Sequence, residues 1–338
     1  MPDLDALAVG HYRRQQRLVR RAVGAVQRLW RRIDPADITG SWTAVAPVLV
    51  GTVAAGQFEA ASMADPYVAA VLEAEGAESR PSGVVSAAAF AGQASDGRPL
   101  SSLLYQPVID WKLRIAAGQS VRDAQRGALA GALRITATQV ADAGRTAVGA
   151  SMAGNRTIRG YIRVAAAPCC ARCAILSGKE FGWNAGFARH PRCDCIHVPA
   201  TLVARGRGGR LRVPAAPGLV TDARAYFSGL SRAEQDRIFT RAGAQAIRDG
   251  ADISSVVNAR RGMYTADAYG RRVSATREGT TRRGEFFRLE RARAVAAGQT
   301  TRAAFRLRAP RLMPEEIYRL ADDREDAIRM LRRFGYLT

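Results

Sequence analysis

All five cysteines of this 338-residue chain lie in one segment, from Cys169 to Cys195, and two of its three histidines lie within that segment or two residues after it. The candidate ligands are spaced as Cys170-Ala-Arg-Cys173, sixteen residues, and then His190-Pro-Arg-Cys193-Asp-Cys195-Ile-His197. Two thiolates separated by two residues can direct both sulfurs to one ion, and a second short cluster can complete a tetrahedron. The spacing therefore predicts a zinc site whose two halves are joined by a loop.

Four ligands are needed and more than four are present. Cys170 and Cys173 form the best pair, and Cys193 is the third ligand. The fourth is either His190 or Cys195. A free-thiol pocket or a redox or disulfide-forming Cys-x-x-Cys is the alternative, but no βαβ pattern surrounds the pair, which disfavours a thioredoxin-like site. Two further residues fit the spacing less well, His197 and Cys169.

Several patterns typical of a catalytic metal are missing from the sequence. There is no His-Glu-x-x-His segment of the kind found in zinc proteases. A nucleobase deaminase would need a cysteine where Arg172 stands, and a His-x-Glu upstream, where the only histidine is His11. The only acids within the cysteine segment are Glu180 and Asp194. These features favour a structural zinc over a catalytic one.

The charge of the chain is strongly positive and unevenly distributed. The net charge is +21, and apolar residues make up 47 % of the sequence, which is enough for two or three domains with cores. Residues 1–150 carry 16 basic and 13 acidic side chains, whereas residues 151–338 carry 35 and 17. A basic half of this kind favours nucleic acid, an acidic protein or an anionic membrane as partner.

No secretory signal is expected, because residues 1–5 are acidic and no apolar segment follows the first arginines. The most apolar stretch, Trp42 to Ala55, is expected to be too short to span a membrane and contains Pro47 and Gly51. We therefore expect a soluble protein without a membrane partner, in a reducing compartment where clustered cysteines bind metal more often than they form disulfides.

The first 155 residues are expected to form a helical domain. Residues 11–33 have apolar side chains at steps of three and four, with eight arginines between them. Such a helix could lie on a membrane or nucleic acid, but packing on a core with a solvated basic face is favoured. Further helices are expected over 41–75 and 99–117, interrupted at Pro47 and at Asp65-Pro66, and Ser120 should cap a long helix after it.

The hydrophobic periodicity changes near residue 157. Residues 157–164 alternate in the manner of a strand, and 195–199 suit a return strand. We expect an α+β chain that is mostly α, made of a helical domain (1–155), a small zinc-stapled α/β module (156–203), a Gly/Arg/Pro linker (204–218) and a basic C-terminal region with short helices (219–338).

The C-terminal region has helix signals around an arginine-rich segment. Ser231 and Glu234 match a capping box, one or two helices are expected in 222–249, and another short element from Gly250 to Asn258. Residues 271–311 hold 12 arginines and three acids, which suggests a basic loop, either extended along phosphates or merely solvated. Pro314 should begin one terminal helix. The candidate nucleic-acid-binding residues are Arg271, Arg272, Arg277, Arg282, Arg283, Arg288 and Arg291.

The cysteine segment resembles a known family signature. Its order, Cys-x-x-Cys, Ala-x-Leu-x-Gly-Lys at Gly178-Lys179, His-Pro-x-Cys-x-Cys and Val198-Pro199, is similar to that of the phage Mu F-like minor head proteins. Three C-terminal stretches, together with the arginine-rich start of the chain, are similar to minor capsid proteins of tailed phages that infect actinobacteria, so the resemblance covers most of the chain. These stretches are SRAEQDRIFTRAGAQAIRDGADISSVVNARRGM, TREGTTRRG and RLMPEEIYRLA with RRFGYL.

The resemblance implies a non-enzymatic head-morphogenesis protein of the virion, present in few copies and associated with the portal inside the procapsid. Its partners would be the portal, scaffold or major capsid protein, and packaged double-stranded DNA bound without sequence preference. Some relatives carry a fused capsid maturation protease. Outside the cysteine segment and His197 this chain has only one histidine, His11, which does not support a Ser-His protease domain. The rival interpretation is a zinc-dependent hydrolase or nuclease acting on DNA at packaging. The family's metal ligands correspond to Cys170, Cys173, His190, Cys193 and Cys195.

Overall fold

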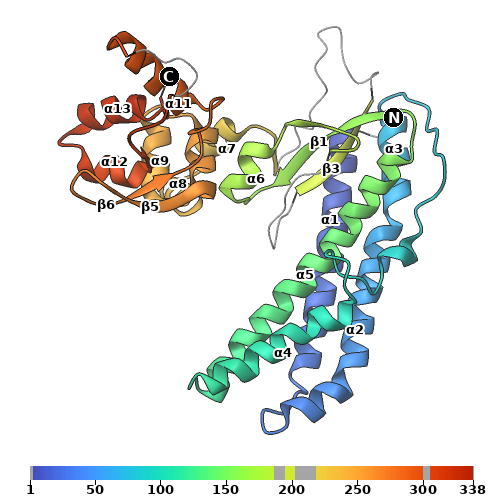
Figure 1. Ribbon diagram of the computed structural model, residues 1–338. Helices are drawn as coiled ribbons and strands as arrows, with labels where there is room; N and C mark the ends of the chain where they lie inside the picture. Colours follow the sequence, from blue (N-terminus) through green and yellow to red (C-terminus); the bar gives the residue numbers. More distant parts are fainter. Residues whose placement is uncertain (1–2, 186–194, 202–217, 300–304, 338) are drawn as a thin grey trace. The chain divides into compact units, whose positions relative to one another are not determined.

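The structure is a computed structural model that describes residues 3–185, 195–201, 218–299 and 305–337 (Figure 1). The chain forms two compact units. Unit 1 comprises Met1–Ala167 and Gly178–Thr221, and unit 2 comprises Pro168–Ser177 and Asp222–Thr338. Helices predominate in both units and each holds one antiparallel sheet, so the expected α+β, mostly α fold class is confirmed.

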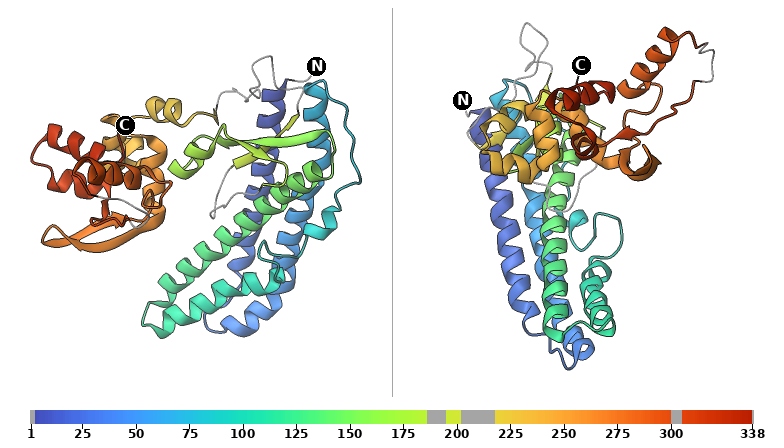
Figure 2. Two further views of the ribbon diagram at one scale, coloured as in Figure 1. Left: turned by 45° about the horizontal axis from the view of Figure 1, so that its top comes forward. Right: turned by 90° about the vertical axis from the view of Figure 1, so that its left-hand side faces the viewer.

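Unit 1 is built on long helices that run side by side (Figures 1 and 2). The three longest, α1, α2 and α5, pack on one another, and α4 packs on α5. Their bounds are α1 Leu4–Trp30, α2 Ile38–Ser62, α3 Ala64–Ala74, η1 Ala87–Phe90, α4 Leu100–Ala116 and α5 Val121–Ala153.

Local signals set most of these helix ends. The Ser120 side chain accepts the backbone N–H of Asp123, which confirms the predicted cap of α5. The expected interruption at Pro47 is wrong, because α2 runs through it. Proline removes one backbone hydrogen bond there, but Pro47 lies on the exposed side of α2, where water can satisfy the released carbonyl. The chain instead breaks at Met63, so Pro66 falls in the first turn of α3.

Helix α2 is therefore longer than the sequence suggested. Together with α3 it forms one helical stretch, Ile38–Ala74, which is long and apolar enough to cross a membrane. Only 28 % of its most apolar 18-residue window is buried. The apolar stretch from Trp42 to Ala55, expected to be too short to span a membrane, is thus part of a longer helical stretch that continues through Pro47 and Gly51.

The bundle has an aromatic centre. The indole of Trp30 lies 6.1 Å from that of Trp42 and 6.0 Å from that of Trp111, measured between ring centroids. The buried face of α1 includes Leu18, Ala22 and Val26. The arginines of α1 face solvent, so the preferred interpretation of an amphipathic helix packed on a core agrees with the structure.

A four-stranded antiparallel sheet lies across one end of this bundle. Its central strand pairs along its length with a return strand, with Ile162 opposite Val198, as the alternation predicted. Both faces of these two strands are buried, and they share a core with α1, α3 and α5. The strands are β1 Ile158–Ala166, β2 Glu180–Gly182, β3 Cys195–Thr201 and β4 Leu219–Val220.

The compact units therefore group the segments differently from the order along the chain. Residues 1–155 and the strands expected in the 156–203 module bury one another's apolar side chains in unit 1, whereas Pro168–Ser177 belongs to unit 2. A short sheet buried on both faces needs partners on both, and the helix ends supply them. The linker at 204–218 lies outside the described residues except for Gly218.

The structure explains why a glycine stands at position 178 in the Gly178-Lys179 motif. Gly178 has φ +74°, and a Cβ there would collide with the Thr221 carbonyl. Its N–H donates to the Arg163 carbonyl at 2.8 Å, and the Arg163 N–H donates to the Lys179 carbonyl at 3.1 Å. A side chain at position 178 would disrupt this return to the sheet.

Unit 2 consists of short helices around the three-stranded sheet β5-β6-β7. The capping box of Ser231 and Glu234 is present, as predicted, at the start of α8. The bounds are α6 Ala171–Leu176, α7 Ala223–Gly229, α8 Arg232–Phe239, α9 Arg241–Arg248, α10 Ile253–Ala259, η2 Arg260–Gly262, β5 Met263–Ala268, β6 Arg271–Thr276, α11 Glu285–Ala296, β7 Arg311–Leu312, α12 Pro314–Leu320 and α13 Arg324–Arg333.

Three C-terminal expectations need correction. Residues 222–249 form three helices, because Thr240, at φ +67°, separates α8 from α9. In place of the single terminal helix that was expected there are two, α12 and α13, because Asp323 caps the start of α13. Segment 271–311 is not a loop but contains β6, α11 and β7. Buried Val273 and Phe286 give it a core face, which the counts of arginine and glycine concealed.

His11 provides a pH-dependent test of the unit 1 core. Its ring is buried and stacks on Tyr67 with centroids 3.9 Å apart, and no hydrogen-bond partner is present at Nδ1 among the described residues. Burial, assisted by the nearby Arg14 charge, lowers the pKa of His11 from 6.5 to about 3. The neutral ring is thus the folded form, and protons bind preferentially to the unfolded chain.

We expect unit 1 to lose about 1.4 kcal/mol of stability through His11 between pH 7.5 and pH 5.5, since the unfolded histidine becomes protonated in that range and the folded one does not. A His11→Phe variant keeps the stacked ring and should lack this contribution. Urea unfolding followed by tryptophan fluorescence reports unit 1, where all four tryptophans lie. Equal pH dependence in the two proteins would contradict the assignment.

Candidate metal-binding cysteines and arginine surfaces

The Cys-x-x-Cys segment forms the first turn of helix α6. Cys170 is the N-cap of this helix, and its Sγ accepts the backbone N–H of Cys173 at 3.4 Å. Cys173 is buried and Cys170 is exposed. A sulfur that accepts a backbone N–H at a helix start can carry negative charge, which a metal ligand requires. The two thiols thus fit the first pair of a zinc site.

Neighbouring helices of unit 2 hold this turn in place. The Cys169 N–H donates to the Tyr226 hydroxyl at 3.0 Å, and that hydroxyl is 3.1 Å from the Cys169 carbonyl. The Arg172 guanidinium bonds Asn258 Oδ1 on α10. Ser177 Oγ donates to the Cys173 carbonyl at 2.8 Å and closes the other end. Backbone and side-chain contacts with α7 and α10 therefore organise the turn in addition to the sulfur contact between Cys170 and Cys173.

Cys195 occupies a different environment, at the start of β3 in unit 1. It is buried, and its Sγ accepts a hydrogen bond from Arg163 Nη2 at 3.0 Å. Its carbonyl accepts from Arg145 Nε at 2.7 Å, and Arg145 is in turn bonded to Asp142 at 2.9 Å. Arg163 is thus the guanidinium that contacts the sulfur, whereas Arg145 bonds the backbone and is paired with Asp142.

Sequence reasoning did not find Arg163. It is 1 % exposed, although arginine is rarely buried to this degree. A signal for it existed: it is the one charged residue in the otherwise apolar run from Tyr161 to Ala166. A charge inside a strand buried on both faces needs a polar partner there.

The predicted ligands are divided between the two units. Cys170 and Cys173 belong to unit 2, Cys195 belongs to unit 1, and His190 and Cys193 lie outside the described residues. Within the described part of the chain no three His, Cys, Asp or Glu side chains form a group that could hold a metal. The weaker candidate His197 lies in the core, with its ring 4.5 Å from Tyr161. The zinc site stays a prediction.

The predicted nucleic-acid-binding arginines divide into three places within unit 2. Arg271 and Arg272 are exposed at the start of β6, and Arg277, just after its end, lies over the Tyr264 ring at 5.4 Å. Arg283 is exposed before α11. Three others line one concave surface of about 400 Å³ on α11, together with Phe287 and Val295: Arg282, Arg288 and Arg291.

Not every arginine of this segment belongs to the surface. Arg311 is 3 % exposed, and it donates to the carbonyls of Phe334, Glu278 and Gly335 at 2.8, 2.9 and 3.0 Å. Its guanidinium also lies 4.1 Å from the Tyr336 ring centroid. Burial lowers the pKa of Arg311. This side chain satisfies carbonyls inside unit 2 and is not available to a ligand.

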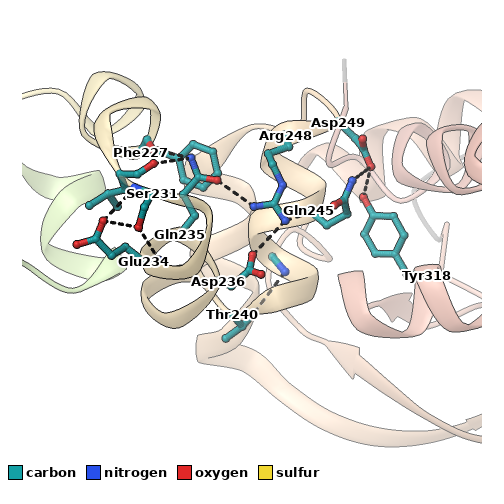
Figure 3. Close-up of polar contacts among 12 residues, drawn as sticks. Phe227, Ser231, Glu234, Gln235, Asp236, Thr240, Gln245, Arg248, Asp249 and Tyr318 are labelled. Carbon is teal, nitrogen blue, oxygen red and sulfur yellow. Dashed lines mark hydrogen bonds and ion pairs between the residues drawn. The ribbon is translucent and has the colours of Figure 1, made fainter.

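Several acids of unit 2 are held in an internal polar network (Figure 3). Arg248 bonds Asp236 at 3.0 Å and Gln235 at 2.9 Å, which ties α9 to α8. Asp249 accepts from the Tyr318 hydroxyl at 2.7 Å and from Gln245 at 3.0 Å, which ties α9 to α12. These carboxylates therefore hold helices of unit 2 together, whereas on α11 the exposed Arg288 and Arg293 pair with Glu285 and Glu290 of the same helix.

Comparison of the chain with protein-family models, with curated proteins and with solved structures gave no match.

Proposed function

We propose that this chain is a minor capsid protein of a tailed bacteriophage that acts in head morphogenesis. In this proposal it is a non-enzymatic virion component, located with the portal inside the procapsid and in the host cytoplasm during assembly. Unit 1 docks on the portal, a zinc ion stabilises the cysteine segment, and exposed arginines contact packaged DNA or scaffold. The family resemblance of the cysteine segment and the C-terminal stretches supports this role.

The observation that carries the docking role is the uncovered apolar side of α2. Residues 38–58 contain no charged side chain, so α2 is uncharged all round up to Glu59 in its last turn. Such a helix is normally buried on every side. Here Val48 is 55 % exposed and Phe58 47 % exposed, and both lie on the side of α2 that faces solvent. An exposed apolar surface on a soluble protein is typical of a partner interface.

The exposed positions form a narrow line suited to another helix. They follow steps of four, three, four and three residues, the spacing of a helix–helix seam. Gly51 lies in the middle of this line, and a Cβ built there has no neighbour within 4 Å, so a partner backbone could approach closely. The line, called here the α2 face, consists of Ala44, Val48, Gly51, Ala55 and Phe58.

A reconstruction of assembled heads tests the proposed role directly. We expect density for unit 1 against the portal, with the α2 face at the contact. Absence of the protein from purified heads, or its location on the outer capsid surface, would contradict the proposal.

The proposed zinc is structural. Cys170 and Cys173 would supply two thiolates, Cys193 a third, and His190 or Cys195 the fourth. The ion would add stability that the short α6 helix lacks. Because Arg163 bonds the Cys195 sulfur, Cys195 also has a structural role that does not need metal.

Contact with DNA through the α11 surface should depend on salt and not on base sequence, since exposed arginines bind phosphates. We expect replacement of the arginines named below by glutamine to reduce the slope of log affinity against log salt by about 0.9 for each phosphate that is no longer neutralised. Fluorescence anisotropy with two unrelated duplexes measures this. Affinity insensitive to salt, or a preference for one duplex, would refute it. The residues to change together are Arg282, Arg283, Arg288 and Arg291.

A further inference from the structure

Helix α1 and the two residues after it carry a long row of positive charge. There is no Asp or Glu between Asp5 and Asp34, and eight arginines lie in that interval. Successive helical residues are about 100° apart, which places all eight within roughly a third of the helix circumference, opposite the buried side. All eight are exposed. This α1 stripe consists of Arg13, Arg14, Arg17, Arg20, Arg21, Arg28, Arg31 and Arg32.

Part of the stripe borders a groove of about 630 Å³ between α1 and the end of α2. Arg14, Arg17, Arg20 and Arg21 line it from α1, and Glu59 is the single carboxylate in the lining. Glu59 pairs with Arg21 at 2.6 Å. Within the described part of the chain, the other three arginines form no ion pair. The groove therefore presents three guanidinium groups whose charge no described residue balances.

Such a row opposes helix formation unless something neutralises it, because like charges three and four residues apart repel. A membrane surface does not suit the stripe. An interfacial helix inserts its apolar side among lipid chains, and the apolar side of α1, including Leu18 and Trp30, is already buried in the bundle. A protein partner suits it little better, since the apolar residues in the groove lining are Leu18, which is buried, and Met63, which is half-buried, and they offer little apolar surface to an anchor.

The length of the stripe matches an extended polyanion. From Arg13 to Arg32 the helical rise corresponds to about 28 Å. A DNA duplex carries one negative charge per ~1.7 Å of its axis, so an equal length offers about 16 phosphates, several on any one side. A single phosphate or small ligand would engage only one or two of these arginines.

We infer that the α1 stripe is a binding surface for double-stranded nucleic acid, contacted through its phosphates. This surface belongs to unit 1, carries no base readout and is distinct from the α11 surface of unit 2. The inference does not depend on the proposed capsid role, because it follows from charge and geometry alone.

The test uses the full-length protein and two unrelated 24-base-pair duplexes, with affinity measured by anisotropy across a salt series. Changing Arg14, Arg17 and Arg20 together to glutamine should reduce the slope of log affinity against log salt by about 2.7, or 0.9 per neutralised phosphate. The same three positions changed to lysine should keep most of the slope, because phosphates accept either cation.

A matched control removes the same charge from unit 1 elsewhere. Arg80, Arg98 and Arg126 each bond a neighbouring carboxylate, and their replacement by glutamine should change the slope by less than one. Circular dichroism should show equal helicity in all variants. Equal effects of the two triple variants would overturn the inference. So would a stripe variant that binds DNA normally but no longer binds polyglutamate, which would make the partner an acidic protein.

Discussion

Replacing Cys173 by serine should abolish zinc binding and destabilise unit 2 around α6. The wild-type protein is expected to carry about one zinc per chain. Structural zinc contributes about 10–16 kcal/mol in small zinc domains, so its loss should lower the thermal midpoint by many degrees. Metal content by mass spectrometry and hydrogen exchange across 168–177 measure both effects. Because Cys173 is buried, water cannot take the place of the metal at this position when zinc is lost.

Cys169 is the matched control for this experiment. It neighbours the pair and is buried, and its backbone N–H and carbonyl both bond the Tyr226 hydroxyl, so its contact with Tyr226 does not rest on the thiol alone. A Cys169→Ser variant should retain zinc. His190→Ala and Cys195→Ser then identify the fourth ligand by stoichiometry, although Cys195→Ser should also weaken unit 1 through its contact with Arg163. Wild-type protein that is metal-free, with thermal stability unchanged by chelators, would refute the zinc site.

Placing a charge on the α2 face should disrupt capture of the portal. We expect Val48→Glu to weaken binding of portal oligomers by about thirty-fold or more, near 2 kcal/mol, because a carboxylate would be buried at the centre of an apolar contact. Binding by the wild-type protein should persist at high salt, since ions screen apolar burial little. Pull-down with purified portal at low and high salt measures this.

The control is Val121→Glu. Val121 is 46 % exposed, close to the exposure of Val48, but it begins α5 and lies off the α2 face. Full-length variants are needed, because a fragment ending at residue 155 would remove β1 and β3 from the core they share with α1 and α5. Capture that is lost on raising salt, or that depends on the α11 arginines and not on Val48, would show that charge makes the attachment.

Short-range patterns were sufficient to predict several elements of this protein. Ser120 before an apolar run predicted the cap of α5, and Ser231 with Glu234 predicted the capping box of α8. Alternation over 157–164 predicted β1. For the candidate metal site, the two-residue spacing of Cys170 and Cys173 predicted two thiols on one turn. Each of these features depends on residues within a few positions of one another, which sequence reports directly.

Features that depend on distant partners were decided only by the tertiary structure. Helix α2 continues through Pro47 because the bundle packs its other side. Arg163 and His11 are buried because strands and helices far apart in sequence close over them. Segment 271–311 folds around Val273 and Phe286, and one of its arginines, Arg311, becomes a core residue.

The arginines show this division most plainly. Composition determined that the chain is basic, and helical spacing determined that those of α1 share one side. Which arginines of the chain stay free for a ligand depends on where carboxylates and carbonyls of other elements lie. On α1, Arg21 is paired with Glu59. In unit 2, Arg311 is bonded to the carbonyls of Phe334, Glu278 and Gly335. Pairing of charges across the fold is set by three-dimensional proximity, which no local pattern encodes.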